Sequence, residues 1–256
     1  MAELFFDCTH GVHKDTFASS LIALLPDPQA FMGSLEALDI PGCRFDLLVA
    51  QDRGVFGVHL AVRQKYHEAQ AHGHDVQEHA HGAHEHPHHS VEEVHHIIEH
   101  AGLSEEVREH VFGVYDIIAA AEAAAHGVDV SEVHFHEVGN HEAIAYICAA
   151  SMAFVQLDVE GATASSVCTG FGFVDCAHGR LPIPAPATAN ILADVPTFAG
   201  NVEGELTTPT GAALVKHFAS SFGDMPSLVF EAFGFGVGPQ GLDSKSTMRT
   251  VLGSER

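Results

Sequence analysis

The sequence has 256 residues, and its 46% hydrophobic content is enough to form the core of one large domain or two small ones. Its formal net charge is −23, from 34 acidic residues against 11 Lys and Arg, which argues against nucleic-acid and anionic-membrane binding because both need clustered basic residues. The N-terminus MAELFFDC has no basic region or cleavage site, and no apolar run reaches about 18 residues, so we expect a cytoplasmic protein.

Apolar periodicity predicts strands and helices along the whole chain. The first half is expected to form a strand at 4–8, a helical stripe at Phe17, Leu21 and Leu24 or Leu25, strands at 44–50 and 55–63 around a turn at 52–54, and helices through 91–98 and from Ser104 to near Gly127. The second half is expected to form an extended segment at 131–135, a helix at 139–157, a β and glycine-rich stretch at 161–174, helices at 187–192 and from Thr208, and strands at 227–235 and 248–252.

Residues 67–89 form a histidine-rich segment, HEAQAHGHDVQEHAHGAHEHPHH, with nine His and four acidic residues in 23 positions. It has almost nothing apolar to bury, so we expect a disordered loop inserted between secondary elements. Its imidazoles can bind several divalent cations loosely, although the segment can also be a linker whose composition has drifted. The simplest fold is a single globular α/β domain over 1–256, with α+β as the alternative.

The five cysteines are widely spaced and lack a C-x-x-C pair, which argues against a disulfide framework and a zinc ribbon. We expect most of them to be small buried hydrophobic residues, Cys8 included. Cys8 lies in a cluster of polar residues with Asp7, His10, His13 and Asp15, where the first strand ends and open α/β sheets present ligands.

The segment VHFHEVGNHEAI at 133–144 carries the strongest metal-binding pattern outside the histidine-rich segment. On an extended backbone His134 and His136 share a face, and Glu137 can ligate the same ion or orient the imidazoles. His141 starts the following helix and completes the predicted metal set. The alternative is a pair of histidines that only form local hydrogen bonds.

Other residues are candidates for acid-base chemistry and anion binding. Glu142 can ligate metal or act as a base, although a glutamate at a helix start needs no function. The proline-led helix starts at 182–188 and 207–211 can direct free N–H groups at a phosphate, or can be ordinary capped helices. The basic residues that can assist a phosphate site are Lys14, Arg180, Lys216, Lys245 and Arg249.

Five stretches together resemble the LarC family, the nickel-insertion proteins of lactate racemase maturation. They are the opening with Asp7, Cys8, Gly11 and Asp15, the histidine-rich segment, VHFHEVG, GFVDCAHGRLPIPAPAT at 172–188, and VEGELTTPTGAAL at 202–214. They occur in the family's order over almost the whole chain, and the last three are specific. The sequence is identified on these motifs as a divergent member, corresponding to the N-terminal part.

The resemblance implies an activity of the nickel chelatase or cyclometallase type, a lyase of cofactor biosynthesis. Nickel is inserted into a thiolated pyridinium mononucleotide, with CTP and a divalent metal such as Mg or Mn, and the CTP step is linked to a C-terminal domain that this chain lacks. A separate C-terminal LarC-like domain or chain is thus an expected partner, and a homo-oligomer is compatible with the sequence. The predicted catalytic residues are Asp7, Asp15, Glu142 and His178, and the predicted cofactor-binding residues are Arg180, Thr188, Thr208, Thr210 and Gly211.

Two departures from the family pattern fall inside these motifs. His13-Lys14-Asp15-Thr16 stands where the family usually has Ser-Gly-Asp-Met, and Glu142 with Tyr146 stands where it usually has two aspartates four residues apart. Losing a charge from a metal or base site can abolish turnover without unfolding the protein. The alternatives are therefore a nickel-binding protein that stores or delivers metal without chemistry, and a metal-dependent hydrolase of an unrelated substrate.

Overall fold

The computed structural model describes residues 2–52, 54–64, 89–135, 138–176, 178–239 and 247–255. Residues 67–88 of the histidine-rich segment, together with His136, Glu137 and Lys245, lie outside the described residues. Within the described part, no helix combines the length and apolar content needed to cross a membrane.

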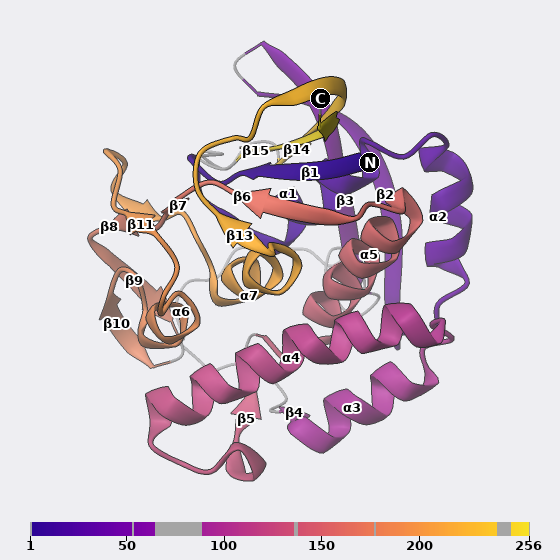
Figure 1. The fold of residues 1–256 in the computed structure, drawn as a ribbon. Helices are drawn as coiled ribbons and strands as arrows, with labels where there is room; N and C mark the ends of the chain where they lie inside the picture. Colours follow the sequence, from indigo (N-terminus) through magenta and orange to yellow (C-terminus); the bar gives the residue numbers. More distant parts are fainter. Residues whose placement is uncertain are drawn as a thin grey trace, which may run out of the picture.

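A seven-stranded mixed sheet forms one layer of the molecule, with the strand order β13-β6-β1-β15-β14-β3-β2. The interior strand β1 pairs in parallel with β6 and antiparallel with the central strand β15, so the first and last described strands are neighbours in the sheet (Figure 1). The seven strands are β1 (Ala2–Asp7), β2 (Cys43–Asp52), β3 (Val55–Gln64), β6 (Gly161–Ala164), β13 (Ser221–Phe222), β14 (Leu228–Val237) and β15 (Thr247–Glu255).

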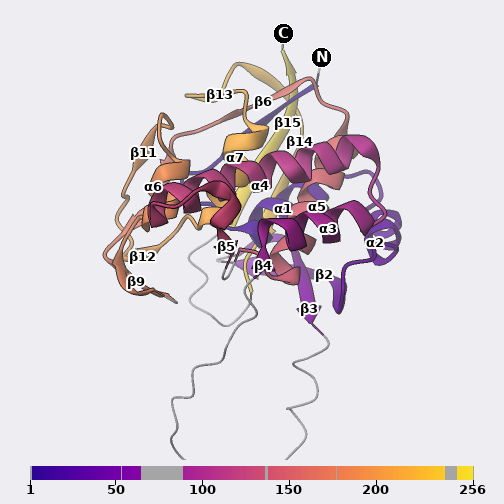
Figure 2. The ribbon, with the colours of Figure 1, turned by 90° about the horizontal axis from the view of Figure 1, so that it is seen from below.

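Helices cover one face of this sheet in two layers (Figures 1 and 2). Helices α1, α5 and α7 lie next to the strands, α4 packs across α5 and α7, and α3 lies along the outside of α4. The described residues form the α-helices α1 (Lys14–Ile22), α2 (Pro28–Glu36), α3 (Val91–His100), α4 (Glu105–His126), α5 (His141–Leu157), α6 (Pro186–Ile191) and α7 (Pro209–Phe218).

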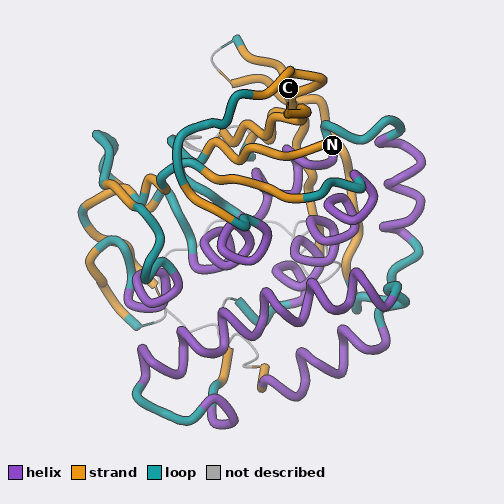
Figure 3. The backbone as a smooth tube through the Cα atoms, viewed as in Figure 1, coloured by secondary structure: helices purple, strands orange, loops and turns teal. Residues whose placement is uncertain are grey.

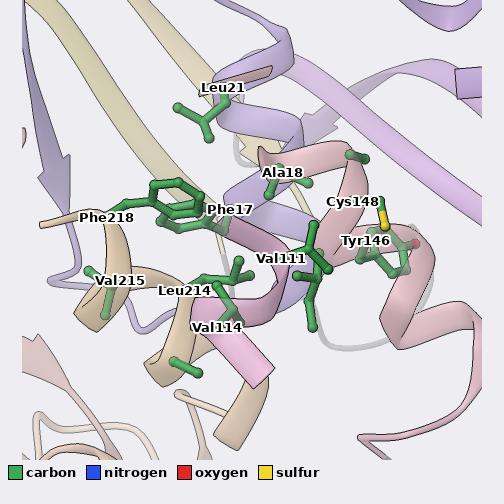
Figure 4. Packing of buried hydrophobic residues seen from close by; sticks show 14 of the residues in the cluster. Phe17, Ala18, Leu21, Val111, Val114, Tyr146, Cys148, Leu214, Val215 and Phe218 are labelled. Carbon is green, nitrogen blue, oxygen red and sulfur yellow. The ribbon is translucent and has the colours of Figure 1, made fainter. Parts of the chain in front are cut away.

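The hydrophobic core lies between the sheet and these helices (Figure 4). Phe17 of α1 is fully buried, with its ring centroid 5.1 Å from that of Phe6 and 6.0 Å from that of Phe218. Residues at three- and four-residue spacing on α4 and α7, including Val111, Val114 and Leu214, face the same core. This is the packing that amphipathic periodicity predicts.

Short strands and loops between α5 and α7 form a small second region beside the main sheet (Figure 3). A hairpin of β9 and β10 pairs Gly179 with Cys176, and places the segment 173–182 close to the end of α4. Its short strands are β7 (Val167–Cys168), β8 (Gly170–Phe171), β9 (Phe173–Cys176), β10 (Gly179–Pro182), β11 (Thr197–Phe198) and β12 (Gly204–Glu205). Outside this region, β4 (His89–Ser90) and β5 (His134–Phe135) pair with each other.

The mixed α/β architecture and most predicted elements are confirmed. Helix α4 has Ser104 as its N-cap and a left-handed Gly127 at its end, and Pro186 and Pro209 begin α6 and α7. Two predictions are wrong. Helix α2 interrupts the expected β-α-β-β opening, and the segment expected to be extended from 131 begins instead with a 3-10 helix at Val130–Glu132, capped by Asp129.

Candidate functional site

The loop after β1 is joined to the segment that leads into α7, which brings two of the sequence motifs together. Val12 N donates to Thr207 Oγ1 at 3.0 Å, and Thr208 N donates to Val12 O at 3.2 Å. Thr207 Oγ1 in turn donates to Cys168 O at 2.7 Å. The contacts are so close that a Cβ on Gly211 would lie 2.0 Å from Val12 O, so Gly211 is a packing requirement of this junction.

Asp7, a predicted catalytic residue, is engaged by neighbours at the end of β1. Its Oδ2 lies 2.7 Å from Arg249 Nη2, and its Oδ1 accepts hydrogen bonds from the hydroxyl and the amide of Thr9. The adjacent Cys8 is fully buried, as expected, and burial raises the pKa of its thiol. The Asp7 carboxylate is therefore already held by Arg249 and Thr9.

Helices α1 and α5 start side by side, and their first turns bring together Asp15 and Glu142. Lys14 Nζ lies 3.3 Å from Glu142 Oε1, and the same ammonium group lies 5.6 Å from the centre of the Tyr146 ring. Burial, and then the charge of Asp15, raise the pKa of the Tyr146 hydroxyl. The two departures from the family pattern, Lys14 and Tyr146, are thus neighbours, and Lys14 pairs with the glutamate that remains.

The Tyr146 hydroxyl takes a structural role at its position. It donates to Leu60 O at 2.9 Å and accepts from Val62 N at 3.2 Å, both on β3. Val58 of β3 pairs with Gly236 of β14. The two residues of β3 that Tyr146 contacts lie further along the strand than this pair.

We therefore expect Tyr146→Phe to lower the free energy of unfolding by about 1–3 kcal/mol, because it leaves partly buried groups of β3 without this partner. Tyr146→Asp should cost more, since it also places a third carboxylate beside Asp15 and Glu142. Urea denaturation of both variants measures the loss. Equal stability of Tyr146→Phe and the unaltered protein would contradict this role.

The predicted metal residues at 134–141 are only partly described. His134 is exposed on β5, opposite Ser90, while the neighbouring Phe135 is buried. His141 instead lies at the start of α5, with its ring centroid 5.3 Å from that of His89. Burial, and then His89, lower the pKa of His141, so its imidazole is neutral near pH 7 and able to bind a metal. Their joint role as ligands stays a prediction.

A cleft of about 330 Å³ lies where the end of α4, the β9–β10 hairpin and the start of α6 meet. The imidazole rings of its lining residues His126 and His178 pack against each other, with centroids 4.9 Å apart, and Glu122 Oε2 lies 3.6 Å from His126 Nε2. The lining residues that can ligate metal are Glu122, His126, Asp175, Cys176, His178 and Glu205.

The cleft combines three of the resembling motifs. Val138 belongs to VHFHEVG, His178 belongs to GFVDCAHG, and Glu205 belongs to VEGELTTPTG. None of the described residues that line it is Lys or Arg, and its carboxylate and imidazole donors suit a first-row divalent cation such as nickel. Among the described residues, the ligand atoms that lie within 4.8 Å of one another are on α3, so the ligand atoms that line the cleft are more widely spaced.

Sequence reasoning found His178 but missed Glu122, His126, Asp175, Cys176 and Glu205. Glu122 and His126 are four residues apart on α4, which puts both on one face of the helix. This spacing is visible in the sequence AAAEAAAH at 119–126. Cys176 and Glu205 stand inside the motifs quoted above. What no pattern indicates is that these separate segments meet at one cleft.

The predicted nucleotide-binding residues lie at the edge of the cleft or behind it. Thr208 caps α7 by accepting from Gly211 N at 3.2 Å, and Arg180 lies 4.6 Å above the exposed ring of Phe173, outside the cleft lining. Thr188 and Thr210 are buried, and Thr188 Oγ1 has no hydrogen-bond partner among the described residues. Their contact with a nucleotide stays a prediction.

Lys216, considered above for a phosphate, has another role. Its Nζ donates to Ile191 O at 2.6 Å and Ala193 O at 3.1 Å, and so satisfies carbonyl groups at the end of α6. Of the five basic residues considered, Lys14, Lys216 and Arg249 are therefore already bound to the protein's own groups. Arg180 is the best-placed described cation for an anionic ligand at the rim of the cleft.

Comparison with known proteins places these observations in a family. A Geobacillus kaustophilus protein is 42% identical over 154 residues, 60% of this chain and 38% of its own length. Proteins of Desulfitobacterium hafniense and Staphylococcus epidermidis are 32% and 34% identical over 99% and 97% of this chain. All three are named pyridinium-3,5-bisthiocarboxylic acid mononucleotide nickel insertion protein.

The chain spans 58% of the length of the Desulfitobacterium and Staphylococcus relatives. No solved structure matches it. The family model for the nickel insertion protein matches residues 4–256, in agreement with the resemblance carried by the motifs. This chain therefore belongs to the nickel insertion protein family.

Proposed function

We propose that this chain is the nickel-binding part of a protein that inserts nickel into pyridinium-3,5-bisthiocarboxylic acid mononucleotide, the substrate in the names of its relatives. The observation that carries the proposal is the cleft, in which His126, His178 and Glu205 come from different segments and face one space. Those names also favour insertion over storage or delivery of nickel without chemistry.

The donor types of the cleft fit a metal that must be transferred. Imidazole and carboxylate hold Ni²⁺ firmly, whereas sulfur donors bind it more covalently, so the thiocarboxylates of the substrate can draw the ion from the protein. Two nickel–sulfur bonds and one nickel–carbon bond form as the ring loses one proton to a base. The protein's task is to present nickel beside the ring carbon and to accept that proton.

His178 is the strongest candidate for the base among the four predicted catalytic residues. Asp7 is bound by Arg249, and Glu142 is paired with Lys14. His178 is exposed within the cleft lining and lies next to the ring of His126. We propose it as the proton acceptor at the metal site, whereas Asp15 and Glu142 lie in the first turns of α1 and α5, outside the cleft lining.

We propose that the CTP-linked step depends on a further region of the protein and not on the residues of the cleft. The relatives are longer than this chain, and we propose that their additional region, as a domain or as a separate chain, provides the CTP site with Mg or Mn. Arg180 and the starts of α6 and α7 are proposed to hold the phosphate of the mononucleotide, since N–H groups at helix starts favour anions.

The proposal is tested by stoichiometric conversion of the thiolated mononucleotide with Ni²⁺, CTP and the additional region of a relative. We expect His178→Ala to slow formation of the nickel adduct by about 100-fold or more, the usual contribution of a positioned acid-base group. His95→Ala, which removes a histidine of α3 outside the cleft, is the matched control and should stay within about twofold.

A binding measurement keeps the test decisive even if conversion is slow in the unaltered protein. The double substitution Glu122→Ala/His126→Ala should weaken nickel binding at the cleft by about tenfold or more, because a carboxylate ligand and an imidazole ligand are lost. Unchanged conversion in His178→Ala together with unchanged nickel affinity in the double variant would refute the cleft as the insertion site.

A further inference from the structure

A second group of metal-binding side chains lies on the outer surface of α3, away from the cleft. The ligand atoms of His96, Glu99 and His100 all lie within 4.8 Å of one another, and the three side chains are exposed. The rings of His96 and His100 are one helical turn apart, with centroids separated by 4.2 Å. Small side-chain rotations suffice to bring the three donors to one ion.

The hydrogen bonding of His100 already prepares it as a ligand. Its Nδ1 lies 2.8 Å from His96 O, and a carbonyl oxygen only accepts, so Nδ1 carries the proton in this contact. The neutral ring then has its lone pair on Nε2, which is free of this bond. Metal-binding histidines are commonly oriented in this way, with the second ring nitrogen donating to a backbone carbonyl.

Helix α3 holds these side chains on a fixed support. Val94 and Ile98 are fully buried and anchor the opposite face of the helix, and a capping box of Ser90 and Glu93 fixes its start. The helix sequence, VEEVHHIIEH, contains three glutamates and no Lys or Arg. The local field therefore favours a cation, and no nearby basic residue of the helix opposes it.

We propose that His96, Glu99 and His100 form a surface site for a first-row divalent metal ion, with nickel, copper and zinc as the class that two imidazoles and a carboxylate select. Three protein ligands leave the remaining positions to water, so the ion exchanges readily. The site does not rest on the proposed insertion activity.

The α3 site is separate from the cleft and cannot share its ion. Helices α3 and α4 run antiparallel and are joined by a short turn, so His100 lies near the start of α4 (Figure 1). Glu122 and His126 lie at its far end, and 17 residues of helix span about 25 Å. An ion bound on α3 therefore lies near the end of α4 that is opposite to the cleft.

The test uses the full chain and Ni²⁺ alone, with residue-resolved NMR so that the histidines of 67–88 are observed separately. Paramagnetic broadening at less than one equivalent of Ni²⁺ should include the backbone and ring signals of 96–100. His100→Ala should remove this broadening, because the chelate loses a ligand. His95→Ala, in which the replaced ring packs on Phe112 outside the cluster, should retain it.

A charge-matched pair makes the assignment of Glu99 specific. Glu99→Gln should weaken binding at α3 about threefold to tenfold, whereas Glu92→Gln, the same charge change on an exposed residue of the same helix, should leave it within about twofold. Signals of 96–100 that remain sharp while other histidines broaden, or broadening that is the same in His100→Ala, would overturn the proposed site.

Discussion

Gly211→Ala is expected to lower the free energy of unfolding by about 3 kcal/mol, although it adds a single methyl group. The added Cβ would lie 2.0 Å from Val12 O and 3.1 Å from His13 Cα, and these are backbone atoms that cannot rotate away. The loop after β1 and the start of α7 would have to separate, with loss of the bonds between Val12, Thr207 and Thr208.

Gly33→Ala is the matched control for this change. Gly33 also lies in a helix, α2, but a Cβ there meets no atom within 4 Å. Alanine is the better helix former, so the control should be neutral or gain up to about 1 kcal/mol. Denaturant unfolding of both variants without ligand decides the role of Gly211. A Gly211→Ala variant of unchanged stability that has lost nucleotide binding would favour direct contact with the cofactor.

Acidification is expected to destabilise the protein through a histidine pair between α4 and α7. His110 Nδ1 lies 2.9 Å from His217 Nε2, and the rings pack against Phe154 and Phe218. Burial, and then His110, lower the pKa of His217 from 6.5 to about 4. Burial also lowers the pKa of His110, against the opposing charges of Glu106 and Glu109 on the same helix.

The lowered pKa values fix the direction of the pH dependence. Between pH 6.5 and about 4 the unfolded chain binds a proton at His217 and the folded chain does not, so stability present above pH 6.5 is lost as the pH falls towards 4. Because the ring is only half-buried, solvent screening limits the loss to about 1–2 kcal/mol for this residue.

Thermal melting from pH 7 to pH 4 measures this effect. His217→Gln removes the titrating group but keeps a polar side chain, so its melting temperature should fall less with acidification than that of the unaltered protein. His10→Gln, a histidine substitution on the exposed loop after β1, is the control and should keep the original slope. If His217→Gln and the unaltered protein lost stability in parallel, the pair would not be the acid-sensitive element.

Local sequence signals predicted the elements well where the residues that decide an element lie within it. Ser104 and Gly127 delimit α4, and Pro209 begins α7, because caps and proline act over a single turn. The missed helix α2 had the same kind of signal, since Asp27 caps it and Pro28 opens it. The helix has only 9 residues, so its apolar periodicity extends over little more than two turns.

The sequence motifs predicted one of the described ligand-type residues that line the cleft, and they did not predict how these residues come together. His178 was identified from its motif, yet its neighbour in space, His126, is 52 residues earlier and at the end of a helix. The contact between His110 and His217 spans 107 residues in the same way. Pairings of this kind depend on how helices pack, which residue spacing within one segment does not encode.

The family and the α/β class were predictable from the amino-acid sequence, because motifs and periodicity are local properties. Which carboxylates are engaged, as Asp7 is by Arg249, and which segments enclose the cleft depend on tertiary contacts. The tertiary structure also showed that Gly211 serves close packing and that Tyr146 bonds to β3. These outcomes follow from the competition of distant groups for the same space, hydrogen bonds and charge.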